Sequence, residues 1–339
     1  MNASEPSRPV VALAMGDPAG ISPELTAKVV TSDEANATAR LVVVGDRRVF
    51  DEGARVAALS PQLATVGRGG AVPRSADPVF VDLAHLDPAS IDRGVASKAG
   101  GMFALANYRY ALELVASRAA DAVSFTPFNK QAMRFALPSY DDEIGFTADV
   151  LGVTGPAAEF NILGRLWNAR VTSHVALGDV PKLLSVEGIV RALELTSTAL
   201  HAAGFDPARI AVAALNPHAG DGGNFGREEI DIIAPAVERA KSLGMPVEGP
   251  FPADTVFVRA RSGAFDAVLT MYHDQGQIAM KLMGFDRGVT LLGGFPFPIC
   301  TPAHGTAYDI AGQGIANLGA TRAAVLLAAS MAQRKARIR

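Results

Sequence analysis

Short apolar runs alternate with longer amphipathic segments along this chain. The apolar runs read VVALAM, LVVVGD, DAVSFTP, ARIAVAALNP and FDAVLTMYH. Runs of this length, bounded by polar residues or by Gly and Pro, are typical of buried β-strands. Segments with helical periodicity lie between them, such as MFALANYRYALELVASRAA and EEIDIIAPAVERAKSLG. The alternation predicts an α/β fold with a largely parallel sheet.

Several of the predicted strands end directly in a polar loop rich in Gly and Pro. Open α/β sheets bind ligands beyond the carboxyl ends of their strands, so we expect the functional site in these loops. No internal repeat with a period of roughly 20 to 50 residues is visible, and no low-complexity linker divides the chain. We expect a surface loop near residues 60–78 and a terminal helix with a basic last turn at residues 323–339.

Length and charge narrow the class of protein. The chain has 339 residues, which exceeds the usual size of one small domain, and 49% of them are hydrophobic. This length and apolar content favour two lobes with an extensive core. Its formal net charge of −3 gives no excess of basic surface, so nucleic acid is not an expected partner.

Cysteine content and the N-terminal sequence bear on location. The single cysteine, Cys300, excludes an internal disulfide and suits a reducing compartment. The apolar run VVALAM is too short for a membrane span or a normal signal core. We therefore expect a cytoplasmic protein that does not bind a membrane.

Three histidines follow apolar, strand-like runs: His174 in VTSHVAL, His218 in LNPHAG and His273 in MYHDQG. They are far apart in sequence, but a fold can bring strand ends together. Three imidazoles would then bind a divalent transition metal and leave positions open for a substrate. The alternative is three ordinary loop histidines.

Three charged residues accompany these histidines. Asp274 follows His273, and Asp254 lies in the proline-rich GPFPADT; either carboxylate could orient a ligand histidine, although Asp254 could equally cap a helix. Lys281 lies eight residues after His273, roughly two helical turns. It could bind an anion or transfer a proton, or it could be a solvated helix lysine.

Two glycine-containing segments lie near the chain ends. MGDPAGISPE joins a predicted strand to a predicted helix and could present backbone N–H groups to an anion, although it is neither G-x-G-x-x-G nor a Walker loop. A structural turn is the alternative. HGTAYDIAGQGIAN places His304 and Asp309 among glycines, a setting that could receive an adenine ring and its ribose. His304 could instead be a packed junction residue.

The motifs together resemble the 4-hydroxythreonine-4-phosphate dehydrogenase (PdxA-type) family. MGDPAGISPE, VTSHVAL, ALNPHAGDGGNFGREEID, GPFPADTVF, MYHDQGQIAMKLMGFDRGV and HGTAYDIAGQGIAN match in order across nearly the whole chain. The resemblance implies a homodimer of the isocitrate/isopropylmalate dehydrogenase-like fold, with two α/β/α lobes around a cleft. We expect residues 1–130 and 266–339 to form an outer lobe with the cofactor segment, and residues 131–265 a central lobe with the dimer interface.

The resemblance also implies a mechanism. In that family NAD or NADP oxidises a secondary alcohol β to a carboxylate, and the β-keto acid then loses carbon dioxide. One divalent metal (Zn, Mg, Mn or Co) would be held by histidines from both subunits, namely His174, His218 and His273. A metal at the hydroxyl oxygen lowers the pKa of the alcohol and stabilises the enolate formed on decarboxylation. The implied cofactor-binding residues are His304, Gly305, Asp309 and Asn317, and the implied catalytic residues are Lys281, Asp254 and Asp274.

Three substrate-side positions depart from the family pattern. Phe146 replaces the histidine that precedes Thr147, Thr290 stands where the family has asparagine, and Ile299 replaces an arginine. Isoleucine cannot make the bidentate contact of arginine with a phosphate. We therefore expect the redox chemistry to act on an unphosphorylated β-hydroxy acid, such as a terephthalate cis-dihydrodiol. Its body would pack on Phe146 and Ile299, while Lys281 binds its carboxylate.

Three other functions remain open. The first is the family's namesake reaction in pyridoxal phosphate synthesis, with the phosphate held by other residues. The second is a phosphate acyltransferase, since such enzymes share this general architecture, although the three histidines count against it. The third is a non-catalytic ligand-binding paralogue.

Overall fold

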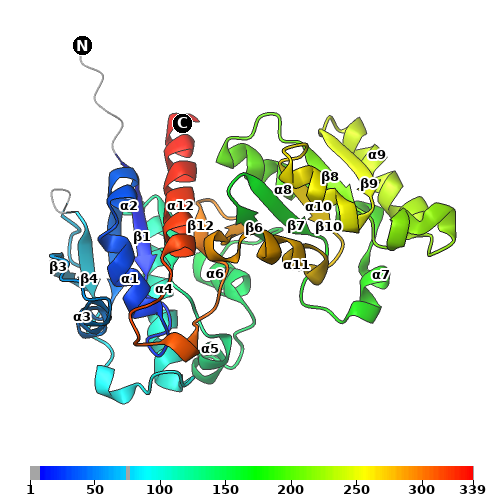
Figure 1. The fold of residues 1–339 in the computed structure, drawn as a ribbon. Helices are drawn as coiled ribbons and strands as arrows, with labels where there is room; N and C mark the ends of the chain where they lie inside the picture. The colour runs from blue at the N-terminus through cyan, green and yellow to red at the C-terminus, as the bar shows by residue number, and fades with distance from the viewer. Residues whose placement is uncertain (1–7, 74–76, 339) are drawn as a thin grey trace, which may run out of the picture. The chain divides into compact units, whose positions relative to one another are not determined.

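The chain folds into two compact units, each built around part of a β-sheet (Figure 1). The computed structural model describes residues 8–73 and 77–338. Unit 1 comprises residues 1–155 and 289–339, and unit 2 comprises residues 156–288. The chain thus leaves unit 1 once and returns to it.

Unit 1 contains seven strands within the described residues, in the spatial order β3-β4-β2-β1-β5-β12-β11. All adjacent strands pair in parallel except β11 and β12, which are antiparallel. The central strands are buried because they carry continuous apolar runs, as parallel strands covered on both faces require. The strands are β1 Val10–Ala14, β2 Arg40–Gly45, β3 Ala64–Gly67, β4 Val79–Asp82, β5 Ala122–Phe125, β11 Val289–Gly293 and β12 Ile299–Pro302.

Helices cover both faces of the unit 1 sheet. α4 (Lys98–Ala116) packs on β1, β2 and β5, whereas α12 (Gly319–Ile338) packs on β5, β11 and β12 from the other face. Ser97 caps α4, because its hydroxyl accepts a hydrogen bond from the N–H of Gly100 at 3.0 Å. The remaining helices of unit 1 are α1 Ser22–Val30, α2 Asp33–Thr38, α3 Arg47–Val56, α5 Lys130–Ala136, α6 Glu143–Leu151 and the short 3₁₀ turns η1 Pro88–Ser90 and η6 Tyr308–Ile310.

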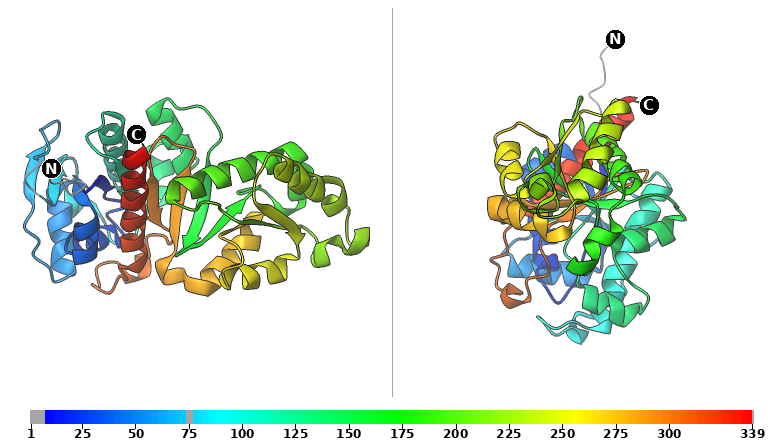
Figure 2. Two further views of the ribbon diagram at one scale, coloured as in Figure 1. Left: turned by 90° about the horizontal axis from the view of Figure 1, so that it is seen from above. Right: turned by 90° about the vertical axis from the view of Figure 1, so that its right-hand side faces the viewer.

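Unit 2 contains five strands within the described residues, in the order β6-β7-β10-β8-β9. β6 and β7 form an antiparallel pair, and β7, β10, β8 and β9 run parallel. In Figure 2, α8 lies on one face of this sheet, and α10 and α11 lie on the other. The strands are β6 Ala158–Leu163, β7 Leu166–Arg170, β8 Ile210–Ala213, β9 Val247–Phe251 and β10 Ala267–Thr270. The helices are α7 Val180–Leu183, α8 Val186–Ala203, α9 Ala234–Ser242, α10 Ala253–Arg261 and α11 His273–Gly284, with the shorter turns η2 Leu177–Asp179, η3 Pro217–Gly223, η4 Glu229–Ile233 and η5 Phe285–Arg287.

The unit boundaries differ from those expected, which fell after residues 130 and 265. Residues 131–155 stay with unit 1 because α5 and α6 pack against α4. Residues 266–288 stay with unit 2 because β10 pairs with β7 and β8, and α11 packs on β6 and β7. Sequence composition changes little at these points, so packing rather than composition sets the boundaries.

Two smaller sequence expectations have clear outcomes. The terminal helix is confirmed as α12. The stretch near residues 60–78 was expected to be a loop, but it contains the edge strand β3, which pairs with β4. Every residue of β3 is exposed or only partly buried, which explains why it lacks an apolar signal.

Among the residues that the structure describes, none of the helices combines the length and apolar character needed to span a bilayer.

Candidate functional site

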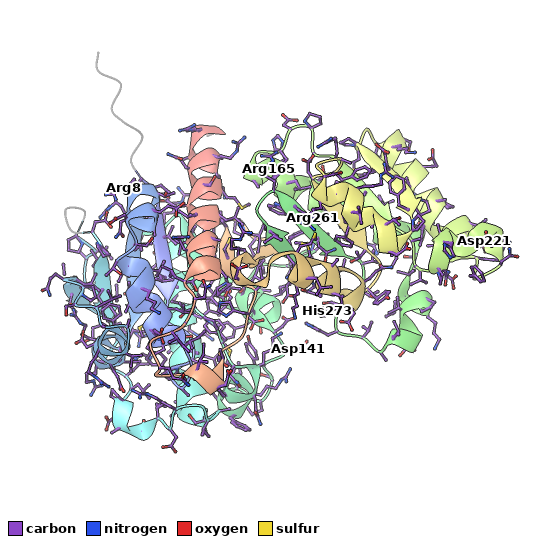
Figure 3. The ribbon with its side chains drawn as sticks, viewed as in Figure 1. Arg8, Asp141, Arg165, Asp221, Arg261 and His273 are labelled. Atoms are coloured by element: carbon purple, nitrogen blue, oxygen red, sulfur yellow. The ribbon has the colours of Figure 1, made fainter. Side chains whose placement is uncertain are left out.

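The imidazole rings of His174 and His273 lie side by side, with their centroids 5.9 Å apart. His174 follows β7, and His273 is the first residue of α11, directly after β10 (Figure 3). β7 and β10 are parallel neighbours, so their carboxyl ends meet at one edge of the sheet. Thr172 strengthens this junction, because its N–H and its hydroxyl both donate to the carbonyl of Met271, at 3.1 and 2.8 Å.

Asp274 fixes the orientation of the His273 ring. The Nδ1–H of His273 donates to the Oδ1 of Asp274 at 2.6 Å. In the neutral form of the ring, this contact leaves Nε2 of His273 with a lone pair, which is the form in which imidazole binds a metal. The predicted role of Asp274 as a carboxylate that orients a histidine therefore has the geometry it requires.

His218 lies apart from the other two histidines within this chain. It belongs to the turn η3 after β8, and Figure 3 labels Asp221 in that turn at the end of unit 2 away from His273. Across residues 8–73 and 77–338, no group of three or more His, Cys, Asp or Glu side chains is arranged to hold a metal ion. One chain thus brings together His174 and His273 but not His218, and the three-histidine site stays a prediction that needs a second subunit.

Gln275 is a residue of this site that sequence reasoning missed. Its Oε1 accepts a hydrogen bond from the N–H of Met271 at 2.7 Å, and its Nε2 donates to the carbonyl of Ala214 at 2.6 Å. One side chain therefore ties the turn that carries His273 to the end of β8, the strand that leads to His218. Its position two residues after His273 in MYHDQG was the available signal, but only the pairing of β8 with β10 shows its partner.

The other two charged candidates are exposed on helices of unit 2. Asp254 lies in the first turn of α10 and is preceded by Pro252 at the helix cap position, so the capping role proposed for Asp254 is not the one observed. Lys281 lies on α11, the helix that begins with His273, which confirms the helical spacing between these two residues. Both side chains are exposed to solvent and thus accessible to a ligand.

Phe146, Thr147 and Ile299, which were expected to line a substrate pocket, are instead part of the core of unit 1. Phe146 is 6% exposed and Ile299 is 0% exposed, and both belong to the apolar cluster between α4 and the sheet. Thr147 is fully buried, and its hydroxyl lies 2.6 Å from the hydroxyl of Tyr108. Thr290 is partly buried on β11, opposite Thr301 of β12. The expectation that a substrate packs on Phe146 and Ile299 is therefore wrong for this arrangement, because neighbouring side chains already cover them.

The predicted cofactor segment, residues 304–317, is held against α1. The N–H of Ala316 donates to Oε1 of Glu24 at 2.8 Å, and Nζ of Lys28 donates to the carbonyls of Gly314 and Ala316 at 3.0 and 2.8 Å. Glu24 and Lys28 also form an ion pair at 2.6 Å. Gly305, Asp309 and Asn317 are exposed and His304 is partly buried, so all four expected residues remain accessible to a ligand.

A second link to the same segment runs through a buried carboxylate. The hydroxyl of Tyr308 donates to Oδ2 of Asp17 at 2.5 Å, and the N–H of Ala19 donates to Oδ1 at 2.8 Å. Burial raises the pKa of Asp17 above its ordinary value, and the hydrogen bonds from Tyr308 and Ala19 offset part of that effect. Asp17 thus joins the MGDPAGISPE loop to the cofactor segment.

The MGDPAGISPE loop itself is a structural turn. Its backbone N–H groups donate to acceptors inside unit 1. The N–H of Gly16 donates to the hydroxyl of Thr126, and that of Asp17 to the carbonyl of Pro127. The N–H groups of Ala19 and Gly20 donate to Asp17, and that of Ile21 donates to the carbonyl of Thr306. These donors are therefore not directed at an external anion. A pocket nevertheless lies beside the loop, between Pro18, Gly20, α3 and Gly312 of the cofactor segment.

Comparison with known proteins identifies the family. The model of the family described as "Pyridoxal phosphate biosynthetic protein PdxA" matches residues 37–328. A protein from Rhizobium meliloti (strain 1021) named "Putative 4-hydroxythreonine-4-phosphate dehydrogenase 2" is 63% identical, covering 97% of this chain and 94% of its own. A relative from Bradyrhizobium diazoefficiens, named "Putative D-threonate 4-phosphate dehydrogenase", is 38% identical over 91% and 92% of the two chains.

Solved structures agree with this assignment. A 4-hydroxythreonine-4-phosphate dehydrogenase from Klebsiella pneumoniae has a TM-score of 0.82 and 34% identity, covering 97% of this chain and 100% of its own. A terephthalate 1,2-cis-dihydrodiol dehydrogenase from Burkholderia xenovorans LB400 has a TM-score of 0.64 and 30% identity, covering 94% and 98%. The fold and these relatives define an α/β oxidoreductase that acts on a secondary CH–OH group. The chain belongs to the family of the pyridoxal phosphate biosynthetic protein PdxA.

The comparisons also correct the expected substrate. An unphosphorylated, terephthalate-like acid was inferred from Ile299, but the relative with 63% identity is named for a phosphorylated substrate. The namesake reaction, given above as an alternative, fits these relatives better. The burial of Ile299 supplies the physical reason, because a position inside the core gives no information about which groups contact a substrate.

Proposed function

We propose that this protein is a metal-dependent, NAD(P)-linked 4-hydroxythreonine-4-phosphate dehydrogenase. The observation that carries the proposal is the pairing of the His174 and His273 imidazoles at adjacent strand ends, in a chain 63% identical to a relative named for this activity. The product is a β-keto acid, which then loses carbon dioxide. Lys281, exposed on the helix that begins with His273, is assigned to pair with the phosphate or the carboxylate of the substrate.

The residues at this edge of the sheet fit part of a divalent metal site. His174 and His273 would hold the metal, with His218 of the other subunit as the third ligand. Such a metal supplies Lewis acidity at the substrate hydroxyl. Asp274 would keep the proton of a neutral His273 ring on Nδ1, and Thr172 joins the ends of β7 and β10, so the two imidazoles stay close before any ligand arrives.

The proposal includes NAD or NADP at the segment of residues 304–317. Exposed Gly305, Asp309 and Asn317 offer polar groups to an adenosine, and α1 holds the segment in place through Glu24 and Lys28. The neighbouring pocket beside Pro18 and Gly312 provides an adjacent concave surface.

The proposal also includes a homodimer that completes the site. The segment directly after His174 carries three exposed apolar side chains, Val175, Leu177 and Leu183, which are 43%, 67% and 51% exposed. Burying such a group against a second subunit would be favourable. This surface begins at a metal-ligand candidate, so the same contact would bring a partner's residues to the site.

The test is an assay of nicotinamide reduction with added Mg²⁺, Mn²⁺, Co²⁺ or Zn²⁺. We expect turnover of 4-hydroxythreonine 4-phosphate, little turnover of 4-hydroxythreonine, and a loss of about 100-fold or more in His174→Ala. His201→Ala is the control, because His201 is exposed in the last turn of α8. Preference for D-threonate 4-phosphate would replace the substrate but keep the reaction class, whereas activity that needs no metal would overturn the proposal.

A further inference from the structure

The turn that carries His218 has an unusual backbone. His218, Ala219, Gly220, Asp221 and Gly222 all have positive φ, with values of 54°, 56°, 79°, 45° and 65°. Residues other than glycine rarely adopt this left-handed region, and several consecutive residues in it are rarer still. A turn of this kind persists only when its surroundings hold it.

Glu229 accepts hydrogen bonds from the residues that lead into this turn. Its side chain is 3% exposed, and its Oε1 accepts hydrogen bonds from the N–H groups of Leu215 and Asn216, both at 2.8 Å. Its Oε2 accepts a third bond, from Nδ2 of Asn216 at 3.0 Å. The carboxylate thus fixes the two residues that lead into Pro217 and His218.

The same carboxylate also lies against the middle of the turn. A Cβ placed on Gly220 would come within 2.7 Å of Oε2 of Glu229, which shows how closely backbone and carboxylate approach. Beyond Gly220 the turn closes on itself, because the N–H of Phe225 donates to the carbonyl of Gly220 at 3.1 Å. Entrance and middle are therefore both set relative to one buried side chain.

We propose that Glu229 is a positioning residue that holds the turn after β8 so that His218 presents its imidazole as a metal ligand. This inference rests on the proposed function, in which His218 completes the metal site. Glu229 acts mainly through the backbone, because its Oε1 accepts the backbone N–H groups of Leu215 and Asn216, while its Oε2 accepts the side-chain Nδ2 of Asn216. Without it, the N–H groups of Leu215 and Asn216 lose their acceptor, whereas Nδ2 of Asn216 still donates to Oε2 of Glu228 at 2.7 Å. The left-handed residues would then relax toward ordinary conformations.

The experiment compares wild type with Glu229→Ala and Glu229→Gln. Glu229→Gln keeps one oxygen for Leu215 and Asn216 and replaces the other with an NH₂ group, so we expect it to fold even if Glu229→Ala does not. Asp231→Asn is the matched control, because it removes one negative charge from the same short helix, where Asp231 pairs at 2.8 Å with the exposed Arg227. Zn²⁺ binding to metal-stripped protein is measured by titration calorimetry.

A second readout does not depend on metal. Arg227 lies at the end of the same loop and is exposed, so the rate of trypsin cleavage after Arg227 in metal-free protein reports the order of the turn. We expect Glu229→Ala to weaken Zn²⁺ binding about 10-fold or more and to accelerate cleavage, Glu229→Gln to show smaller effects in the same direction, and Asp231→Asn to leave the Zn²⁺ affinity unchanged.

The outcomes separate this inference from the proposed function. Equal Zn²⁺ affinities in wild type and both Glu229 variants would overturn the positioning role while leaving the metal site standing. Wild-type protein that binds no Zn²⁺, Mn²⁺, Co²⁺ or Mg²⁺ would overturn the proposed metal site, and the positioning role with it. Unchanged cleavage after Arg227 in Glu229→Ala would show that the carboxylate does not hold the turn.

Discussion

Asp17 shows how one residue couples two segments that are almost the whole chain apart in sequence. Its carboxylate is 1% exposed and accepts hydrogen bonds from Tyr308 and Ala19. Burial raises its pKa, so the folded chain binds this proton more tightly than the unfolded chain does. For an acid of this kind, the contribution to stability is present at low pH and is lost as the pH rises.

Asp17→Asn should therefore change stability in a pH-dependent way. The free energy of unfolding of the variant, relative to wild type, is expected to rise as the pH increases above the ordinary value of 3.8 and to level off above the raised pKa. Urea unfolding at a series of pH values measures this difference. Tyr308→Phe removes a hydrogen bond that lowers the pKa of Asp17, so the pH range over which its stability changes should extend to a higher pH. A difference that is constant with pH would contradict the argument.

At the scale of elements, two glycines in helices differ in the space that is available for a side chain. Gly276 lies in α11, and a Cβ there would come within 2.1 Å of Oδ1 of Asn168, a fully buried residue of β7. Gly145 lies in α6, and a Cβ there would meet its nearest neighbour, Asp142, at 3.5 Å. The first glycine permits close contact between helix and strand, whereas the second occupies ordinary space.

Alanine should thus have opposite effects at the two positions. Gly276→Ala is expected to lower the free energy of unfolding by about 1–3 kcal/mol, because Asn168 and α11 must separate. Gly145→Ala is expected to raise it by about 0.5–1 kcal/mol, because alanine loses less backbone entropy in a helix. Denaturant unfolding of both variants provides the comparison. A Gly276→Ala variant as stable as wild type would show that the contact relaxes easily.

At the scale of the whole molecule, the proposed site requires two chains. His174 and His273 come from one chain, whereas His218 would come from the other. A mixture of His174→Ala and His218→Ala chains, refolded or exchanged together, then forms heterodimers in which one of the two sites has all three histidines. Random pairing makes about half of the dimers heterodimers, so about one quarter of wild-type activity should return.

A matched mixture tests the grouping of the ligands. His174→Ala mixed with His273→Ala should recover nothing, because both histidines belong to the same half of the site in one chain. Both mixtures are assayed for nicotinamide reduction after the dimer has been confirmed by sedimentation. Recovery in the second mixture but not in the first would show that the ligands are divided differently between the subunits.

Secondary structure was predictable where burial imposes a clear pattern. The five apolar runs became β1, β2, β5, β8 and β10, because a strand covered on both faces must be apolar throughout. The edge strand β3 was missed because its residues face solvent. The segment EEIDIIAPAVERAKSLG is helical as predicted, but it begins with the separate short helix η4 before α9.

The sequence by itself determined the α/β class, the family and the candidate residues, because periodicity and ordered motifs are local properties of a chain. Only the tertiary structure showed that His174 and His273 adjoin while His218 lies elsewhere, since the order of strands in a sheet joins residues about a hundred positions apart. It also placed Phe146 and Ile299 in the core. Burial of a side chain depends on which other parts of the chain pack around it. The sequence alone therefore could not show whether Phe146 and Ile299 line a pocket or lie in the core.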